Sequence, residues 1–201
     1  MIDFAQYFKG HSLAESSELN ELLSQVKLVN VKRGEVLQHR GDDAKHAYFV
    51  RSGLLRSFSV DEKGKEHVFM FAPEGWIISD IQSTAMQSPA VLSIDALEDT
   101  VVEVIRADIF EELVNTHMDS HPDFAGLELN RLLRRIAVLQ KRVLLLLSAT
   151  ATERYQEFIT TYPNLQQRVS QRLIASYLGI TPEALSRIRV ELIKSERSAS
   201  V

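Results

Sequence analysis

The chain has 201 residues, of which 45% are hydrophobic and 25% are charged, and its formal net charge is −4. This balance is typical of a globular protein with one large domain or two modest ones. The chain contains no cysteine, which excludes disulfides, thiolate zinc sites, cysteine-ligated clusters and a cysteine nucleophile. The longest apolar run, VLLLLSATA, is far shorter than the roughly 20 residues that a membrane helix needs. The N-terminus lacks the pattern of a secretory signal, so we expect a soluble, cytoplasmic protein.

The charge is unevenly distributed along the chain. Residues 1–148 hold 16 Lys and Arg against 22 Asp and Glu, whereas residues 149–201 hold 7 against 5. An acidic body with a mildly basic C-terminal part suits a protein that contacts nucleic acid with one part only, although so small an excess also arises by chance.

The N-terminal half predicts one helix followed by an all-β region. The apolar residues of LAESSELNELLSQV, residues 13–26, follow helical spacing. From there to Trp76, short β-branched and aromatic runs are separated by glycine or aspartate, which predicts an antiparallel β-roll or barrel. Gly64 supplies the turn of the clearest hairpin, in SVDEKGKEHVF. A further strand pair, AVLSIDAL and TVVEVI, ends this region near Ile105, and RADIFEELVNTH predicts a short helix.

A long helix is predicted from Pro122 to Ser148, because no helix breaker follows Gly126. Its 27 residues span roughly 40 Å at 1.5 Å per residue. Apolar side chains recur at alternating spacings of three and four, which is a heptad seam, and basic residues lie on the opposite side. A helix that covers its own domain is an alternative, but the length and the additional leucines favour a dimer interface. The residues predicted to form it are Leu129, Leu132, Ile136, Leu139, Val143 and Leu146.

The C-terminal part predicts two helices joined by a tight turn. A helix in ATATERYQEFITTYP and a connector, NLQQRVS, come first. Ser170 is then a candidate N-cap for QRLIASYL, and Gly179 permits the left-handed conformation that ends a helix. Thr181 caps the next helix, and Pro182 occupies its first position, where a missing N–H is tolerated. Ala175 is small, as a close helix crossing requires. This arrangement is a helix-turn-helix.

The second helix of this pair is expected to present a polar face. With its leucines and isoleucines turned inward, Glu183 and Arg187 lie on the far side, four residues apart. This spacing is typical of a surface salt bridge worth roughly a few tenths of a kcal/mol. It also suits base reading, in which Arg187 donates to guanine and Glu183 accepts from cytosine. The candidate base contacts are Glu183, Ser186 and Arg187, and the candidate phosphate contacts are Ser170, Arg172, Arg189 and Lys194.

The order of β-roll, long helix and helix-turn-helix resembles the CRP/FNR family of bacterial transcription regulators. RGEVLQHRGDDAKHAYFVRSGLLRSF resembles the family's cyclic-nucleotide-binding-type roll, and IASYLGITPEALSRIR resembles its DNA-reading unit. The resemblance implies a homodimer with two recognition helices in successive major grooves of a palindromic site, about 34 Å apart. It places Glu183 and Arg187 at base-contacting positions and suggests RNA polymerase as a further partner. Pro182 stands where a basic contact residue occurs in relatives, so the base preference is expected to differ.

The pocket of the cyclic-AMP-binding members of that family does not match this sequence. Their Gly-Glu and Arg-Ser pairs correspond here to Ser79-Asp80 and Pro89-Ala90. Residues 68–105 contain no Lys, Arg or His, and a phosphate buried among carboxylates is costly. Arg56, an arginine of the long helix or backbone amides are alternative donors, but cyclic AMP is not the expected effector. Candidates for lining a pocket for an uncharged or aromatic effector, or else for simple core packing, are Trp76, Asp80, Met86 and Phe69.

An enzyme of the cupin type is an alternative of another class, because a β-roll can hold a metal. That requires a close set of His and carboxylate ligands, and His39, His46 and His67 have no ligand-like spacing. We therefore predict no catalytic residues, no metal and no cofactor. After Lys194 only SERSASV remains, in place of the β-hairpin wing of many relatives, which lowers the expected number of phosphate contacts.

Together these features predict an α+β protein. We expect a β-roll in residues 1–120, a dimerisation helix in 121–148 and a helix-turn-helix domain in 149–201. The predicted function is a homodimeric, sequence-specific transcription regulator with an unidentified effector. The alternatives are an orphan regulator that needs no ligand, and a small-molecule-binding roll with weakened DNA binding.

Overall fold

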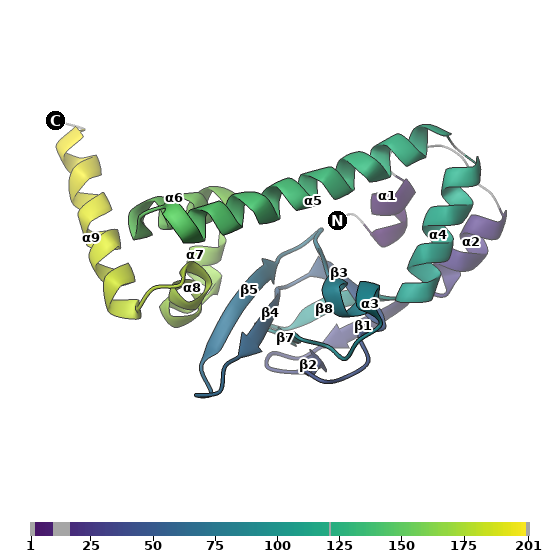
Figure 1. Ribbon diagram of the computed structural model, residues 1–201, viewed down its shortest axis with the longest axis horizontal. Coiled ribbons are helices and arrows are strands. Elements are labelled where there is room, and N and C mark those ends of the chain that lie inside the picture. The colour runs from purple at the N-terminus through teal and green to yellow at the C-terminus, as the bar shows by residue number, and fades with distance from the viewer. Residues whose placement is uncertain (1–2, 10–16, 121, 200–201) are drawn as a thin grey trace. The chain divides into compact units, whose positions relative to one another are not determined.

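The computed structural model describes residues 3–9, 17–120 and 122–199, and the side chains of 8–9, 18–19, 116–132, 134–135 and 195–199 lie outside this description. Figure 1 labels the helices and, except for β6, the strands in chain order. Contacts divide the chain into two compact units, residues 1–128 and 129–201. The finer division of the chain into three parts stays a prediction.

In the described part of unit 1, the strands form two four-stranded antiparallel sheets, of order β1-β8-β3-β6 and β2-β7-β4-β5. This confirms the predicted β-roll. Gly64 occupies the turn between β4 and β5 with a φ of +75°, as expected for that hairpin. The strands are β1 (Lys27–Val31), β2 (Val36–Gln38), β3 (His46–Ser52), β4 (Leu55–Val60), β5 (Glu66–Ala72), β6 (Ile77–Ile78), β7 (Ser93–Ala96) and β8 (Thr100–Arg106).

The prediction that β7 and β8 pair with each other is wrong. β7 pairs with β2 and β4, whereas β8 pairs with β1 and β3. The connection at residues 97–99 carries the chain from one sheet to the other. It is held by Leu54, whose carbonyl accepts from the Leu97 N–H at 2.9 Å and whose N–H donates to Thr100 Oγ1 at 3.1 Å. Both strands therefore contribute to the core from opposite sheets.

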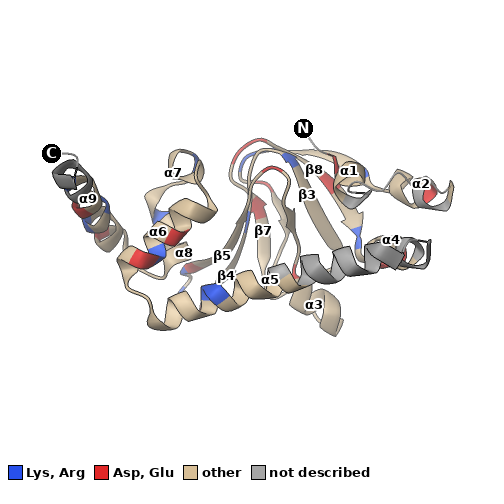
Figure 2. Cartoon of the chain, turned by 90° about the horizontal axis from the view of Figure 1, so that it is seen from above, with Lys and Arg blue, Asp and Glu red and all other residues tan. Residues whose placement is uncertain are grey.

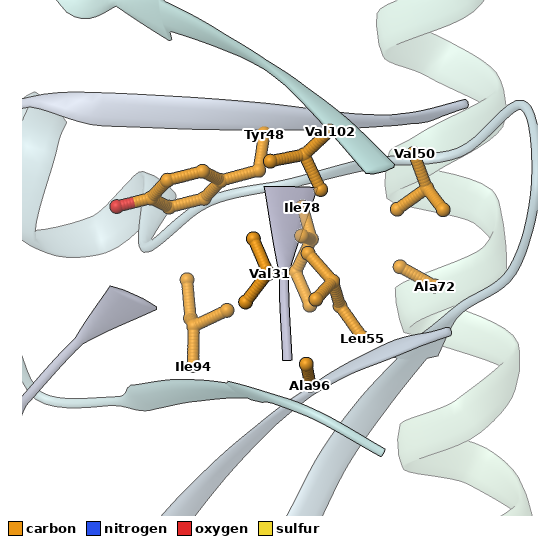
Figure 3. Close-up of a cluster of buried hydrophobic side chains, with 9 residues drawn as sticks. All are labelled: Val31, Tyr48, Val50, Leu55, Ala72, Ile78, Ile94, Ala96 and Val102. Atoms are coloured by element: carbon orange, nitrogen blue, oxygen red, sulfur yellow. The ribbon is translucent and has the colours of Figure 1, made fainter. Parts of the chain in front are cut away.

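The core of the roll is a cluster of buried apolar side chains from both sheets (Figure 3). Alternation along each strand directs every second side chain to this layer. The Tyr48 hydroxyl satisfies its polar end by donating to the Leu37 carbonyl at 3.0 Å. The members of the cluster are Val31, Tyr48, Val50, Leu55, Ala72, Ile78, Ile94, Ala96 and Val102.

Three helices cover a second apolar cluster of unit 1. They are α1 (Phe4–Lys9), α2 (Ser17–Ser24) and α4 (Ala107–Ser120). Phe4, Phe49 and Leu113 are buried at the centre of this cluster. The predicted helix of residues 13–26 is present as α2 and ends at Ser24, whereas residues 10–16 lie outside the described part of the chain.

The long helix and the helix pair are present in the structure. They are α5 (Pro122–Ser148), α6 (Ala151–Thr161), α8 (Gln171–Leu178) and α9 (Pro182–Ala199). A single helical turn, α7 (Leu165–Arg168), occupies the segment that the sequence predicts as a connector. None of the described helices combines the length and the hydropathy that crossing a bilayer requires.

Two glycines of the roll provide a matched stability test. A Cβ at Gly53, which has a φ of +93°, would lie 2.7 Å from the Thr100 Cα and 2.8 Å from the Asp99 carbonyl oxygen. A Cβ at Gly64 would meet nothing within 4 Å. Both alanine variants incur the left-handed backbone cost of about 1–2 kcal/mol, but only Gly53→Ala also forces backbone atoms apart. We expect Gly53→Ala to lower the free energy of unfolding by at least about 3 kcal/mol and Gly64→Ala by about 1 kcal/mol.

The measurement is urea unfolding followed by the fluorescence of Trp76, which is the only tryptophan of the sequence and lies in the roll. Equal losses of stability in the two variants would contradict the close approach at Gly53.

Candidate nucleic-acid interface

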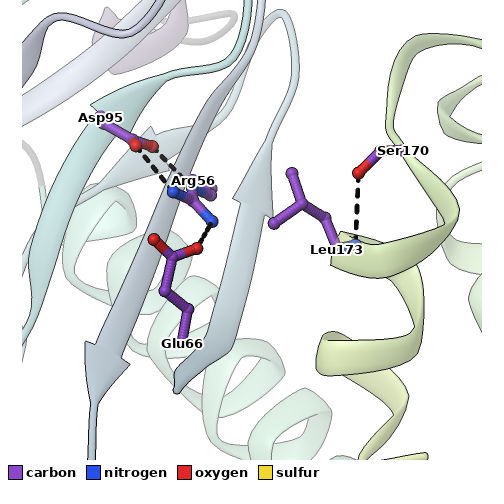
Figure 4. A network of polar contacts seen from close by, with 5 residues as sticks. All are labelled: Arg56, Glu66, Asp95, Ser170 and Leu173. Atoms are coloured by element: carbon purple, nitrogen blue, oxygen red, sulfur yellow. Dashed lines mark hydrogen bonds and ion pairs between the residues drawn. The ribbon is translucent and has the colours of Figure 1, made fainter. Parts of the chain in front are cut away.

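The helix pair has the caps that its sequence predicts. Ser170 precedes α8, and its hydroxyl oxygen accepts from the Leu173 N–H at 3.4 Å (Figure 4). Gly179 ends α8 with a φ of +68° in the left-handed region. The Thr181 hydroxyl oxygen accepts from the Ala184 N–H at 3.2 Å. These local bonds satisfy N–H groups that the first turn of a helix leaves without partners, so both helices start where the sequence indicates.

Packing between the helices fixes which face of α9 is turned inward. Leu185 and Ile188 of α9 are buried, as are Ile174, Ala175 and Leu178 of α8. Because Leu185 and Ile188 are three residues apart, they lie on one side of α9, and the opposite side is left for other contacts. The small side chain of Ala175 lies in this core, as predicted.

The opposite side of α9 exposes the three predicted base contacts. Glu183, Ser186 and Arg187 are all exposed, and Figure 2 shows charges of both signs on this helix. The Glu183 backbone N–H and the Thr181 hydroxyl hold the pKa of the Glu183 carboxyl below its usual value, and the charge of Arg187 adds to this. Glu183 is therefore ionised at neutral pH and acts as a hydrogen-bond acceptor beside a permanent donor.

The four predicted phosphate contacts differ in accessibility. Ser170 and Arg172, at the start of α8, and Lys194 are exposed. Arg189 is half-buried. Burial raises the pKa of the Tyr155 hydroxyl, and the positive charge of Arg189 opposes this shift, which puts Arg189 near α6. It is therefore less open to a ligand than the other three.

Helix α5 exposes the predicted seam. Ile136, Leu139, Val143 and Leu146 keep between 42% and 53% of their surface exposed. At about 100° per residue, all four lie within about 80° of Ile136 around the helix axis. The side chains of two further predicted seam residues, Leu129 and Leu132, lie outside the described residues. Exposed leucines at 133, 144 and 147 widen the same apolar face.

Asp80 has a structural role that the sequence interpretation missed. It is the N-cap of α3 (Ile81–Met86) and is 1% exposed. Its carboxylate accepts from the N–H groups of Ser83 at 3.2 Å, Val91 at 2.7 Å and Leu92 at 2.9 Å. An aspartate directly before a short helical run is itself a capping signal, so this role was readable from the sequence.

The other residues predicted to line an effector pocket are placed differently. Trp76 is partly buried and packs against the core cluster of Figure 3. Met86 and Phe69 are 70% and 41% exposed. These positions favour the core alternative for Trp76 and put Met86 and Phe69 at the surface.

Arg56, an alternative phosphate donor, is engaged inside the roll. It is buried, and its Nε and Nη2 donate to the two carboxylate oxygens of Asp95 at 2.7 and 2.8 Å (Figure 4). Its Nη1 donates to Glu66 at 2.7 Å, and its guanidinium lies 4.1 Å from the centre of the Phe58 ring. Two carboxylates thus already neutralise this guanidinium.

Comparison with known proteins shows which family the chain resembles. Residues 28–117 match the model of the cyclic nucleotide-binding domain. The anaerobic regulatory protein of Haemophilus influenzae is 29% identical over 87% of this chain and 69% of its own length. The fumarate and nitrate reduction regulatory protein of Vibrio cholerae is 28% identical over 91% of this chain and 74% of its own length.

Solved structures share the fold. FixK2 from Bradyrhizobium japonicum superposes with a TM-score of 0.67 at 20% identity, covering 85% of this chain and 86% of its own. A crp/fnr family protein from Eubacterium rectale gives 0.64 at 18% identity, covering 90% and 85%. The matched domain, the named relatives and the shared fold together support a regulator of the CRP/FNR family.

These findings support a transcription regulator of the CRP/FNR type, and the named relatives are regulators and not enzymes. The predicted fold of antiparallel β-roll and C-terminal helices is confirmed. Regulators of this family bind DNA and commonly act as dimers, so DNA and a second copy are the partners to consider for α9 and α5.

The role of Asp80 can be tested against an exposed aspartate. Asp80→Ala leaves three N–H groups without their charged acceptor, so we expect the free energy of unfolding to fall by about 3 kcal/mol or more. Asp43 is an exposed residue whose carboxylate binds Lys45 at 2.7 Å, and Asp43→Ala is expected to cost no more than about 1 kcal/mol. Urea unfolding followed by Trp76 fluorescence measures both. Wild-type stability of Asp80→Ala would contradict the structural role.

Proposed function

We propose that this CRP/FNR regulator is a homodimer that recognises a palindromic DNA site by inserting α9 into the major groove. The observation that carries the proposal is the division of α9 into two faces. Leu185 and Ile188 anchor one face in the core of unit 2, while Glu183, Ser186 and Arg187 are exposed on the other. A rigid helix with an exposed donor and acceptor pair is what reading of base edges requires.

In this proposal each exposed polar residue has a defined chemical role. Arg187 donates two hydrogen bonds to guanine O6 and N7, and Glu183 accepts from cytosine N4. Ser186, between them, contacts a base edge or the sugar. Ser170 and Arg172, at the start of α8, hold phosphates. The Ser170 oxygen already accepts from Leu173, and its hydroxyl hydrogen remains as the donor to a phosphate oxygen.

The C-terminal part of α9 completes the phosphate contacts. Lys194 is exposed and contributes charge without sequence preference. Arg189 is half-buried, so it contributes to the local potential more than to a direct contact. Because Arg189 is half-buried, DNA binding releases fewer counterions than it would if all the predicted phosphate contacts were exposed. We therefore expect the affinity for DNA to fall less steeply as the salt concentration rises.

Dimerisation through α5 would place two α8–α9 helix pairs, one from each copy, on one DNA site. Ile136, Leu139, Val143 and Leu146 form the exposed apolar face that a second copy would cover. Their heptad spacing suits two helices packed side by side along their length. Two symmetric α9 helices then read half-sites about one helical turn, or roughly 34 Å, apart.

We infer that an effector, if one is required, is not a cyclic nucleotide. Arg56 is bound by Asp95 and Glu66, and residues 68–105 supply no cation. A cyclic phosphate would therefore find no available guanidinium partner in Arg56 or in residues 68–105. An orphan regulator that binds DNA without a ligand is the second candidate, and the internally satisfied charges of the roll favour it. RNA polymerase is the inferred partner at the promoter and the cytoplasm the inferred location.

Arg187 and Arg172 provide a matched test of base reading and phosphate contact. Selection from random DNA should first yield a palindrome with the wild-type protein. Arg187→Ala should then relax the preference at one position per half-site and weaken specific binding by about 1–3 kcal/mol. Arg172→Ala, which removes the same charge, should weaken all sequences alike and reduce the salt slope by about 1 per contact. Unchanged preference in Arg187→Ala would contradict its role in base reading.

Two valines of α5 test the dimer interface. Val143 lies on the exposed seam, and Val138, five residues away, lies about 140° from it around the axis. Both are more than half exposed in the single chain. Val143→Glu places a charge in the proposed interface and should raise the dimer dissociation constant at least about tenfold. Val138→Glu should leave it unchanged. Sedimentation velocity over a concentration series measures both, and equal effects would contradict this interface.

A further inference from the structure

Two arginines from different helices bind the C-terminal end of α8. Arg142 of α5 donates from Nη2 to the Tyr177 carbonyl at 3.1 Å. Arg154 of α6 donates from Nη1 to the Leu178 carbonyl at 2.7 Å. The last carbonyls of a helix have no partner within the helix and form the negative end of its dipole. The end of α8, directly before the turn into α9, is thus held by two guanidinium groups.

Besides its hydrogen bond to the Tyr177 carbonyl, Arg142 stacks on the Tyr177 ring. Its guanidinium carbon lies 3.7 Å from the centre of the Tyr177 ring. That ring is itself fixed, because it packs 5.6 Å from the ring of Phe158 and 5.7 Å from the ring of Tyr162, centre to centre. A planar group that is both stacked and hydrogen-bonded has little rotational freedom. Arg142 therefore restrains the orientation of α8 relative to α5, and not only the distance between these two helices.

The contact uses a side of α5 next to the seam, because Arg142 lies only about 40° from the seam residue Leu146 around the helix axis. Arg142 lies about 120° from Ile136 around the helix axis, whereas Val143 lies within about 20° of it. A Cβ on Gly179 would lie 3.6 Å from Leu146 Cδ2 and 3.5 Å from Arg154 Nη1. The last two turns of α5, including the seam residue Leu146, therefore lie beside the turn between α8 and α9, and the four described seam residues still keep at least 42% of their surface exposed.

We propose that Arg142 is a positioning residue that fixes α8 and α9 relative to α5 and thereby sets which half-site spacing the dimer accepts. This inference rests on the proposed function, in which α5 joins two copies and α9 reads each half-site. The direction of α9 relative to the dimer axis then depends on how α8 is held against α5. Arg154 holds the same helix end from α6.

The first experiment measures binding as a function of half-site spacing. The selected operator is remade with one or two base pairs inserted or removed at its centre, and each base pair turns one half-site by about 35° relative to the other. Wild-type protein should lose about tenfold or more in affinity for each base pair. Arg142→Ala should flatten this profile to about threefold or less while keeping the same preferred bases.

Two further variants separate positioning from general stability. Lys141 is the neighbouring cation of α5 and pairs with Glu157 at 2.7 Å on the surface. Lys141→Ala removes the same charge without touching Tyr177 and should keep the wild-type spacing profile. Arg142→Lys retains a charged donor but no planar group, and it should give an intermediate profile. A uniform loss at all spacings in Arg142→Ala would overturn the proposal, because a merely structural role predicts that result.

A second measurement needs no DNA. The sequence has no cysteine, so Val138→Cys on α5 and Glu191→Cys on α9 can carry two nitroxide labels in a background of unlabelled protein. Double electron–electron resonance should give a narrow distance distribution in the otherwise wild-type chain and a broader one with Arg142→Ala. An equally narrow distance distribution with Arg142→Ala would show that Arg142 does not restrain α9 relative to α5. If the wild-type protein selects no paired half-sites, the proposed function fails, and this measurement decides the role of Arg142 separately.

Discussion

Helix α5 carries two surfaces of different chemistry, one polar and one apolar. One side binds the C-terminal helices through Lys141 and Arg142, and the other exposes apolar side chains over several turns. Water disfavours so large a contiguous apolar face. Polar, directional contacts occupy the inner side, and in the proposed function a second copy covers the apolar side. Everything proposed for DNA recognition depends on this separation.

The roll and the helix pair use their charged residues differently. In the roll, Arg56 and Asp80 are buried and bonded to internal partners. In the helix pair, Glu183 and Arg187 are exposed. A buried charge with its bonds satisfied stabilises one conformation and offers little to a ligand, whereas an exposed charge on a rigid helix retains its capacity to bind. This contrast supports the proposal that α9 binds DNA and that the roll acts as a scaffold.

Similarity to CRP/FNR regulators indicates the general function, but it does not determine which bases, effector or half-site spacing this chain recognises. The relatives that match nearly its whole length are under 30% identical, so most side chains differ. Pro182 at the start of α9, the cation-free stretch 68–105 and the stacked Arg142–Tyr177 pair are features of this sequence. They bear on base preference, effector class and half-site spacing, which are the properties in which regulators of one fold differ.

The amino-acid sequence alone was sufficient for features that depend on near neighbours. Caps at Ser170 and Thr181, the left-handed Gly179 and the seam of α5 follow from spacings of a few residues, and the structure contains them. The tertiary structure decided the contacts between distant residues. Arg56 meets Asp95 across 39 positions, and Arg142 meets the Tyr177 carbonyl across 35. No local pattern encodes such pairs, because they form only after the fold brings separate elements together. The assignment of β7 and β8 to different sheets has the same cause.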